Sequence, residues 1–417
     1  MFIRKEWENL RSVVIHRPGI EIDYAMLAPR AFLFERPFNK EKAIREHVEL
    51  EEKLRENGVN VRLLREMFNS QASTNRVFRT AMEEKVKERV VFYGELDDSK
   101  RLVNDFSKNI SYLDSDTLFN LMILEPSIDV RMDESNNMQY PKIFSNIPLA
   151  NLYFMRDQQA TGSNGIISGR MKLPQRRAEP PITGFIMEHI IGRKHVSKIS
   201  ENAFFEGGDY IPCGEFGLIG TGPRTDIQGA KDAIASGMLA HDEIFVLENP
   251  KYDFMVDDLL NNMHLDTYFN IASDGVAICS TRLAKKAWGQ VYERDGENYT
   301  PGRKMVLYDY MVEKGFSILD LSVVEQLSYS SNFLTLSNGK ILCVDSSKVF
   351  RKLLKNNIIN REIASKSSFD LPGSDDPMFP VPEKMRQFGI DYITIDLEEL
   401  TGGYGGAHCM TMALERS

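Results

Sequence analysis

The sequence predicts an α/β protein built from a repeated unit of helix, turn and strand. Three observations support this fold class. An apolar run near the N-terminus stops at a turn, an amphipathic helix leads through glycine into a strand, and this helix-turn-strand phrase returns further along the chain. The composition, 42% hydrophobic and 27% charged over 417 residues, is typical of a globular chain with a well-buried core.

The first elements are a strand, a helix and a second strand. The apolar run 12–16 is followed by Arg17-Pro18-Gly19, which predicts a strand that ends in a turn. Residues 40–57 then carry apolar side chains at helical spacing, with Gly58 as a C-cap before a strand over 59–64. The side chains on the buried helix face are expected to be Ala43, Ile44, His47, Leu50 and Leu54.

The same phrase returns three times, which makes four copies of one unit. Sequence identity between the copies is poor, so the repeat is visible in the pattern of elements and not in the residues. The three later copies are helix 229–239 into strand 244–247, helix 304–314 with Gly315 into 316–321, and helix 383–388 with Gly389 into 390–397.

A segment without this phrase lies between the first copy and the second. The chain has no glycine between Gly94 and Gly162, and residues 75–91 and 115–124 show helical spacing. We therefore predict a mainly helical insertion at 72–147 in an α/β catalytic domain formed by 1–71 and 148–417. The alternative, a separate N-terminal domain, is disfavoured because the first strand and helix must pair with something downstream.

Charge and hydropathy exclude two classes of partner. The net charge is −9 with a pI near 5.5, and no basic run is long enough to follow a phosphate backbone, so we expect no nucleic acid partner. The N-terminus is charged where a signal peptide needs an apolar stretch, and no apolar run approaches the length of a membrane span. We expect no membrane partner and a cytoplasmic location.

The four cysteines are expected to be free thiols. They are widely spaced and form no CxxC pair, which argues against a zinc ribbon and a disulfide framework. Cys279 and Cys343 lie in apolar strand-like runs and Cys213 follows Ile211-Pro212, so these three are expected to be buried small hydrophobes. The fourth, Cys409, follows a glycine-rich run that can leave its thiol accessible.

Four stretches combine ionisable side chains with glycine or strand residues. Taken singly, each is compatible with a structural role, as an exposed polar strand face, a simple turn or a glycine-rich loop. The stretches are Asn151-Leu-Tyr-Phe-Met-Arg-Asp157, Phe205-Glu-Gly-Gly-Asp209, Met263-His-Leu-Asp266, and Gly402-Gly-Tyr-Gly-Gly-Ala-His-Cys409. His264 and Asp266 are two residues apart, so on a strand both would project from one face.

Together and in this order, the four stretches resemble the arginine deiminase family of the guanidino-modifying (pentein) superfamily. The resemblance covers nearly the whole chain. It is also carried by His16-Arg17-Pro18-Gly19, by Phe34-Glu35-Arg36-Pro37 leading to Glu46-His47, by Met171 with Arg176 and Glu179, by Arg224-Thr225, and by the ending Cys409-Met410-Thr411-Met412.

This resemblance implies a propeller of five ββαβ-type units around a central substrate channel, and a hydrolase that converts L-arginine to citrulline and ammonia. The nucleophile would be Cys409, and His264 the acid and base with Glu206 as its partner. Asp157 and Asp266 would hold the guanidinium. The resemblance implies no metal or cofactor, and a homodimer or homotetramer. The remaining substrate-binding residues would be Asn151, Phe154, Arg176, Arg224 and Asp209, with the two arginines on the substrate carboxylate.

The chemistry of a guanidinium agrees with these residue types. A guanidinium has five N–H donors in a planar fork, which two carboxylates can hold by paired hydrogen bonds. Two buried carboxylates without a counter-ion are costly, so an empty pocket of this kind should await a cation. A cysteine with an ordinary pKa near 8.5 is mostly protonated at neutral pH, and a bound cation would lower that pKa.

The sequence departs from the family pattern near the nucleophile. Many bacterial members have an arginine five residues before the cysteine, where this chain has Tyr404, and Ala413 stands where proline is often found. Arg177 beside Arg176 leaves the carboxylate ligand ambiguous by one residue.

The sequence leaves three alternative functions open, two of them enzymatic. An agmatine deiminase would have no use for carboxylate-binding arginines, an amidinotransferase would pass the amidino group to an amine, and an inactive binding protein would not need the complete set of nucleophile, base and carboxylates.

Overall fold

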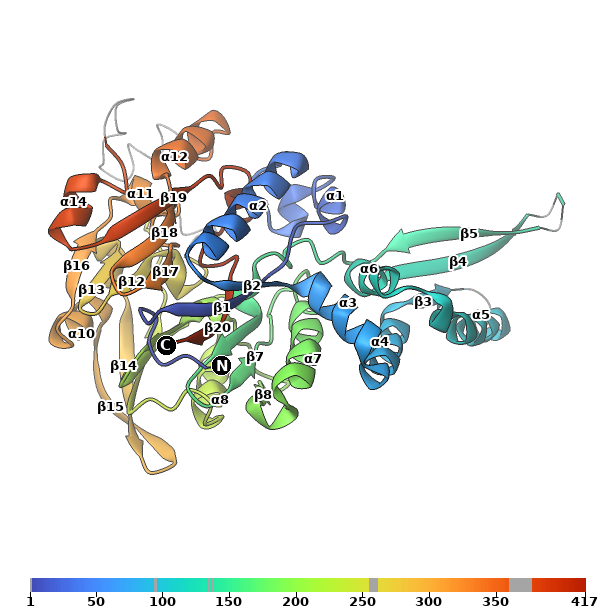
Figure 1. Cartoon of the computed structure of the whole chain (residues 1–417), viewed down its shortest axis with the longest axis horizontal. Helices are drawn as coiled ribbons and strands as arrows, with labels where there is room; N and C mark the ends of the chain where they lie inside the picture. Colours follow the sequence, from blue (N-terminus) through green and yellow to red (C-terminus); the bar gives the residue numbers. More distant parts are fainter. Residues whose placement is uncertain (1, 94–95, 134, 137, 255–261, 360–376) are drawn as a thin grey trace.

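The structure, a computed structural model, describes residues 2–93, 96–133, 135–136, 138–254, 262–359 and 377–417. Within these residues, five sheets surround a common centre and a sixth lies in an arm that extends from the body (Figure 1). None of the described helices is both long and apolar enough to cross a lipid bilayer.

The five central sheets share one topology. In each, two antiparallel strands are followed by a helical connection and a third strand parallel to the second, which is the expected ββαβ unit. In chain order, the first four sheets contain β6 (Gln159–Thr161), β7 (Ile166–Ser168) and β8 (Val196–Lys198); β9 (Tyr210–Cys213), β10 (Phe216–Thr221) and β11 (Glu243–Glu248); β12 (Phe269–Ser273), β13 (Val276–Cys279) and β16 (Ser317–Asp320); and β17 (Leu334–Ser337), β18 (Lys340–Val344) and β19 (Asp391–Ile395).

The fifth sheet joins the two ends of the chain. The C-terminal strand β20 (Met412–Arg416) pairs antiparallel with β1 (Leu10–Ile15), which pairs parallel with β2 (Asn60–Leu63). The two termini accordingly lie close together (Figure 1). This pairing completes the fifth unit from both ends of the chain and confirms the predicted fold class.

The connecting helices pack on the sheets by their apolar faces. They are α2 (Lys40–Glu56), α7 (Glu179–Ile191), α8 (Ile227–Ala235), α9 (Thr281–Ala284), α10 (Leu307–Glu313), α12 (Ser346–Lys355) and α14 (Pro382–Gln387). In α2, the Asn39 side chain caps the first turn by accepting from the Lys42 N–H at 3.0 Å, and Ala43, Leu50 and Leu54 are fully buried. Gly58 follows with a φ of +77°, a left-handed conformation that glycine adopts without strain.

The predicted repeat differs from the structure in two places. Residues 304–306, predicted as the start of a helix, end the strand β15 (Asn298–Val306), which pairs with β14 (Trp288–Asp295) and widens the β11 sheet. The unit that contains α7 was missed. This helix is apolar on most of its surface and so lacks the one-sided pattern by which the other helices were found.

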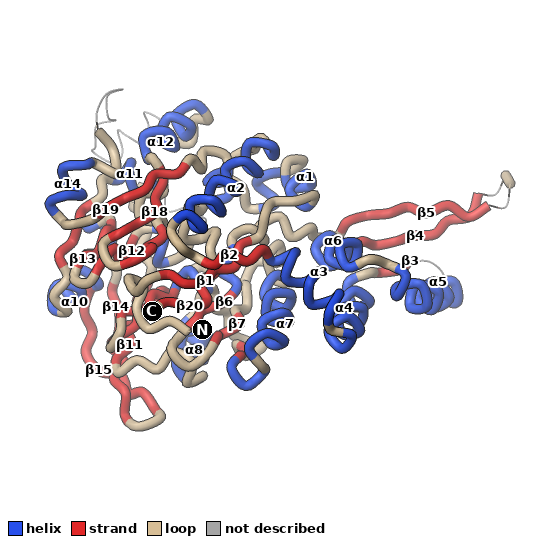
Figure 2. The backbone as a smooth tube through the Cα atoms, in the orientation of Figure 1, coloured by secondary structure: helices blue, strands red, loops and turns tan. Residues whose placement is uncertain are grey.

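The predicted insertion contains strands as well as helices. It holds the end of α3 (Leu64–Thr74), then α4 (Arg76–Arg89), α5 (Leu96–Asn109), α6 (Ser115–Leu124), and a sheet of β3 (Val91–Tyr93), β4 (Pro126–Asp133) and β5 (Met138–Ser145). The hairpin β4–β5 reaches furthest from the body (Figure 2). Apolar and charged residues alternate along 128–133, a strand signal that the prediction of a mainly helical segment did not take into account. Residues 94–95, 134 and 137 of this segment lie outside the described residues.

Two short α-helices and seven short 3-10 helices complete the described structure. They are α1 (Glu21–Ala25), η1 (Pro29–Phe32), η2 (Ile110–Tyr112), η3 (Met155–Gln158), η4 (Arg193–His195), η5 (Gly207–Asp209), η6 (Leu265–Thr267), α11 (Val323–Leu327) and η7 (Leu400–Gly403).

Candidate active site

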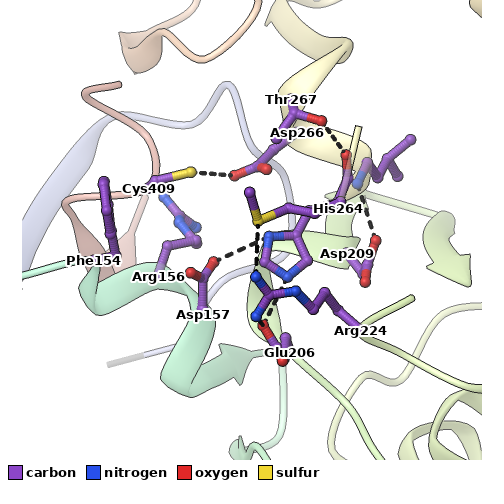
Figure 3. A network of polar contacts seen from close by, with 12 residues as sticks. Phe154, Arg156, Asp157, Glu206, Asp209, Arg224, His264, Asp266, Thr267 and Cys409 are labelled. Carbon is purple, nitrogen blue, oxygen red and sulfur yellow. Dashed lines mark hydrogen bonds and ion pairs between the residues drawn. The ribbon is translucent and has the colours of Figure 1, made fainter. Parts of the chain in front are cut away.

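The candidate catalytic residues meet at the centre of the five sheets. Each lies at the entrance to the first strand of a unit: Asp157 in η3 before β6, Glu206 and Asp209 around η5 before β9, His264 and Asp266 around η6 before β12, and Cys409 before β20. Equivalent points of the repeat face the same centre, so residues that are distant in sequence lie together there (Figure 3).

A hydrogen-bonded pair of His264 and Glu206 lies on one side of the site. The Nε2 atom of His264 is 2.9 Å from Glu206 Oε2, and its Nδ1 atom is 3.5 Å from Asp157 Oδ1. Burial alone would lower the pKa of His264, but the negative charge of Asp157 and the hydrogen bond to Glu206 outweigh it and raise the pKa to about 9. The imidazole is therefore protonated at neutral pH and can donate a proton.

Glu206 remains ionised beside this imidazolium. Burial opposes its charge, but the Arg224 guanidinium and the bonded His264 hold the pKa of Glu206 at about 2. Arg224 Nη1 lies 3.7 Å from Glu206 Oε2. The carboxylate can thus orient the ring of His264 and stabilise its charge.

The thiol of Cys409 lies across the site from this pair. Its Sγ atom is 3.4 Å from Asp266 Oδ2, and the residue is 3% exposed. Burial and the charges of Asp266 and Asp157 raise the pKa of the thiol well above its ordinary value. Without a bound cation, the thiol is therefore protonated at neutral pH, and a cation near Sγ would lower its pKa.

Asp157 and Asp266 lie on either side of the space between the thiol and the imidazole (Figure 3). One oxygen of each carboxylate contacts a neighbouring side chain. Asp157 Oδ2 accepts from Arg176 Nη1 at 2.5 Å, and Asp266 Oδ2 is 2.7 Å from His408 Nδ1. The other oxygen of each, Oδ1, has no hydrogen-bond partner among the described residues. Two buried acceptors are thus left for a ligand with several N–H donors.

The residues expected to bind the rest of the substrate take different positions. A small pocket is lined by Asn151, Phe154, Arg176 and Arg224, together with Asp157, His264, Cys409, Leu33, Met263, Gly403 and Tyr404. Asp209 is absent from this lining. Its Oδ1 atom accepts from the Leu265 N–H at 2.9 Å and from Asn249 Nδ2 at 2.7 Å, so it supports the backbone between His264 and Asp266.

The two arginines differ in how many of their N–H groups have hydrogen-bond partners. Arg176 donates to Asp157, to both oxygens of Glu179, and to the Phe154 carbonyl at 3.1 Å. Arg224 is bound more loosely, since its Nη1 atom has no hydrogen-bond partner among the described residues. Arg177 is exposed and donates to the Lys172 carbonyl, which places Arg176 and not Arg177 at the pocket.

The segment that carries Cys409 is anchored by the N-terminal motifs. Glu46 on α2 accepts from the backbone N–H groups of Glu399 and Leu400, both at 2.9 Å. Arg36 donates to the Glu398 carbonyl at 2.7 Å and to Thr401 Oγ1 at 2.9 Å. These contacts hold the start of the loop that ends at the nucleophile.

Local backbone geometry differs from one expectation. His264 and Asp266 lie at a 3-10 turn, not on a strand, and both side chains still face the site. Gly207 and Gly208 allow a close approach of neighbouring atoms, and neither has a positive φ. A Cβ atom on Gly208 would lie 2.8 Å from Asp157 Oδ1 and 2.9 Å from His264 Nδ1.

We expect Gly208→Ala to lower kcat by about a hundredfold, because the added methyl group must push His264 or Asp157 out of place. The matched control is Gly222→Ala, where the nearest atom to a new Cβ, the Cβ of Asn249, is 3.6 Å away. Steady-state turnover of both variants checks this, with thermal unfolding to confirm that they fold. Normal kcat for Gly208→Ala would contradict the tight packing described here.

Asp157, Glu206 and His264 could also present ligand atoms to a metal ion, since one atom from each lies within 4.8 Å of the others. However, Glu206 and His264 are already bonded to each other, and the cations Arg176 and Arg224 lie beside Asp157 and Glu206. This arrangement suits proton transfer better than binding of a further cation of high charge.

The remaining cysteines are buried, free thiols, as predicted. Cys213, Cys279 and Cys343 lie in β9, β13 and β18, and burial raises the pKa of each thiol above its ordinary value. None of the three lines the pocket that contains Cys409.

Two residues at the site were not predicted. Asn332 Nδ2 donates to Cys409 Sγ at 3.1 Å, and His408 is the partner of Asp266. His408 was visible in the sequence beside the nucleophile. Asn332 belongs to none of the four stretches, and its place before β17 would have been a signal only once the five-unit repeat was known.

Comparison with known proteins identifies the family of this chain. The family model described as arginine deiminase matches residues 30–416. The chain belongs to the arginine deiminase family. Curated relatives named arginine deiminase include those of Halobacterium salinarum (24% identical, covering 99% of this chain and 96% of the relative) and Oenococcus oeni (25% identical, 99% and 97%).

Solved structures of similar fold come from related enzymes. A dimethylarginine dimethylaminohydrolase from Pseudomonas aeruginosa, in complex with citrulline, covers 97% of this chain and 99% of its own, with a TM-score of 0.51 and 13% identity. The N-terminal domain of ArgZ, a cyanobacterial arginine dihydrolase, covers 97% and 98%, with a TM-score of 0.53 and 12% identity. At these identities the likeness concerns the pentein fold alone.

Proposed function

We propose that this protein is an arginine deiminase that hydrolyses L-arginine to L-citrulline and ammonia through a covalent intermediate on Cys409. The observation that carries the proposal is the pair of buried carboxylates, Asp157 and Asp266, beside a thiol and an imidazolium. The Oδ1 atom of each has no hydrogen-bond partner among the described residues, and that of Asp157 lies 3.5 Å from His264 Nδ1. A guanidinium is the planar cation whose several N–H groups match two such acceptors.

Binding of the guanidinium also activates the nucleophile. The pKa of the Cys409 thiol is raised in the empty site by burial and by negative charge, and a cation between Asp157 and Asp266 offsets that charge. When substrate is present, the thiol therefore loses its proton to solvent, and the thiolate forms close to the guanidinium carbon. Without a bound cation, the buried thiol stays protonated.

The first half of the reaction forms a carbon–sulfur bond. Cys409 Sγ attacks the guanidinium carbon, and the resulting tetrahedral adduct receives a proton from the His264 imidazolium on its terminal nitrogen. The carbon–nitrogen bond breaks, ammonia leaves, and a thiouronium remains on the sulfur. Glu206 stabilises the charge of the imidazole before the transfer and holds its orientation.

The second half breaks the carbon–sulfur bond. His264, now neutral, takes a proton from water as the oxygen adds to the same carbon. The adduct collapses as the electron pair of the carbon–sulfur bond returns to Cys409. The oxygen gives up its second proton, the sulfur anion regains the proton of the resting thiol, and citrulline is released. The net reaction consumes one water for each ammonia, and His264 ends protonated as it began.

Arg224 is the residue best placed for the carboxylate of the substrate, because it lines the pocket and keeps Nη1 without a hydrogen-bond partner among the described residues. We expect Arg224→Gln to raise KM for arginine by about ten- to a hundredfold, the loss of one charge-assisted hydrogen bond. KM for agmatine, which has no carboxylate, should change much less. The exposed Arg177→Gln serves as the control.

An equal rise in KM for arginine and for agmatine would show that Arg224 acts only through Glu206 and does not bind a carboxylate. Comparing the two substrates on one variant separates the two roles, since the effect of Arg224 on the pKa of Glu206 is common to both.

The proposed function is tested by measuring ureido product and ammonia with arginine, with agmatine, and with arginine plus glycine. Citrulline and ammonia in equal amounts from arginine alone would support the proposal. Product from agmatine only would favour an agmatine deiminase. Product that requires glycine and appears without ammonia would favour an amidinotransferase, and no product with any substrate would favour an inactive binding protein.

A further inference from the structure

One unit of the repeat has no assigned role in the reaction. Four of the five units place a polar or nucleophilic side chain at the entrance to their first strand, and these residues form the site described above. The equivalent position of the remaining unit, just before β17, is Asn332. Its side chain is 1% exposed and lies at the same centre.

The hydrogen bonds of Asn332 settle the orientation of its amide. The oxygen Oδ1 accepts from the N–H of Gly406 at 2.7 Å and from the N–H of Cys409 at 3.1 Å. Because both of these partners are donors, the side chain cannot be reversed without losing two bonds. The Nδ2 group is therefore the one that points to Cys409 Sγ at 3.1 Å, and it also donates to the Asp266 carbonyl at 3.1 Å.

The surroundings of the sulfur make this donor important. Asp266 Oδ2 lies 3.4 Å from Sγ, and its charge disfavours a thiolate, as do burial and Asp157. The hydrogen bond from Asn332 acts in the opposite direction and lowers the pKa of the thiol. A neutral donor can do this without competing with the cationic substrate for the two carboxylates.

We propose that Asn332 is a further catalytic residue, whose Nδ2–H donates to Cys409 Sγ and stabilises the thiolate. The same bond acts twice in a turnover. It stabilises the sulfur anion that attacks the guanidinium carbon. It stabilises the same anion again when the carbon–sulfur bond breaks and its electron pair returns to Sγ. The identity of the substrate rests on the proposed function, but the effect on the thiol does not.

The test is the rate at which iodoacetamide alkylates Cys409 at a fixed neutral pH, with Cys409→Ala as the background. Asn332→Asp keeps an acceptor for Gly406 and Cys409 but replaces the donor by a like charge, which should raise the pKa of the thiol by about one to three units. A higher pKa leaves less thiolate at neutral pH, and the greater nucleophilicity of a more basic thiolate offsets only part of this loss. The alkylation rate should therefore fall about threefold to fortyfold. Turnover should fall through kcat, about tenfold or more, with little change in KM.

The matched control is Asn270→Asp. Asn270 is equally buried, but its Nδ2 donates to the Phe333 carbonyl at 2.8 Å and not to the thiol. Its alkylation rate should equal that of the unmodified protein. If thermal unfolding shows that Asn332→Asp does not fold, Asn332→Ala is measured in its place, and a smaller fall is expected because the donor is removed without adding a like charge.

An unchanged alkylation rate in the folded Asn332 variant would overturn the proposal and leave Asn332 a structural anchor of the loop. A slower rate shared by Asn270→Asp would do so too, because it would trace the effect to general disturbance. A slower rate in Asn332→Asp alone supports the proposal, even if the unmodified protein releases no citrulline from arginine. That last result would reject only the proposed function.

Discussion

Cys409→Ala is expected to reduce release of citrulline from arginine by about 10⁵-fold or more, to the background rate. In the proposed reaction, the protein forms its covalent bond to the substrate carbon through Cys409 Sγ. Water cannot replace it efficiently, because the two carboxylates and His264 are placed around Sγ and not around a water site. The loss should be in kcat, since the groups that bind the guanidinium remain.

The fold should survive this change. The thiol contributes one weak hydrogen bond with Asn332 and one contact with Asp266, so its removal should cost about 1 kcal/mol or less in the free energy of unfolding. Thermal unfolding checks this. Cys343→Ala, which removes a buried thiol from β18, is the matched control and should keep normal turnover. Measurable citrulline release by Cys409→Ala above background would reject covalent catalysis.

The second large effect is expected for His264→Asn, with kcat about 10³- to 10⁴-fold lower. The imidazole donates a proton to the departing ammonia and then takes one from water, so both halves of the reaction lose their proton carrier. The control is His241→Asn. His241 is also buried, with Nε2 2.7 Å from the Tyr210 hydroxyl, but it lies in the β9–β11 unit away from the pocket. Near-normal turnover by His264→Asn would mean that another group moves the proton.

The pH dependence of the unmodified protein carries the same information. The pKa of His264 is raised above its ordinary value of 6.5 to about 9, so the imidazolium that donates to ammonia is present at neutral pH and disappears as pH rises past about 9. The rate kcat/KM should therefore fall on the alkaline side. Stability follows the same sign: the contribution of this group is fully present below pH 6.5 and is lost as pH rises through 9.

This alkaline fall in kcat/KM should be absent from the residual activity of His264→Asn. A profile that is identical in the two proteins would show that the alkaline fall belongs to another group. Measuring thermal unfolding across the same pH range separates loss of activity from loss of the fold.

The sequence by itself determined the local elements and the kinds of residue that carry chemistry. The strand β1, the helix α2 with its glycine cap, and the later helix-turn-strand copies each show a local pattern of apolar and turn residues, so they could be predicted directly. The four stretches likewise contain the candidate nucleophile, the histidine and the carboxylates. The unit with α7 was missed because a helix buried on most sides has no stripe to detect.

Only the tertiary structure decided how these residues are paired. Closure of β20 on β1 brings Cys409 back to the centre, where Asp157 and Asp266 meet it from other units. The pairing of Arg176 with Asp157, the support of Leu265 by Asp209 and the bond from Asn332 to the thiol all join residues that are distant in sequence. Such partners are selected by packing across the whole fold, because burial makes each polar group take the nearest complementary atom, and no local pattern records which atom that is.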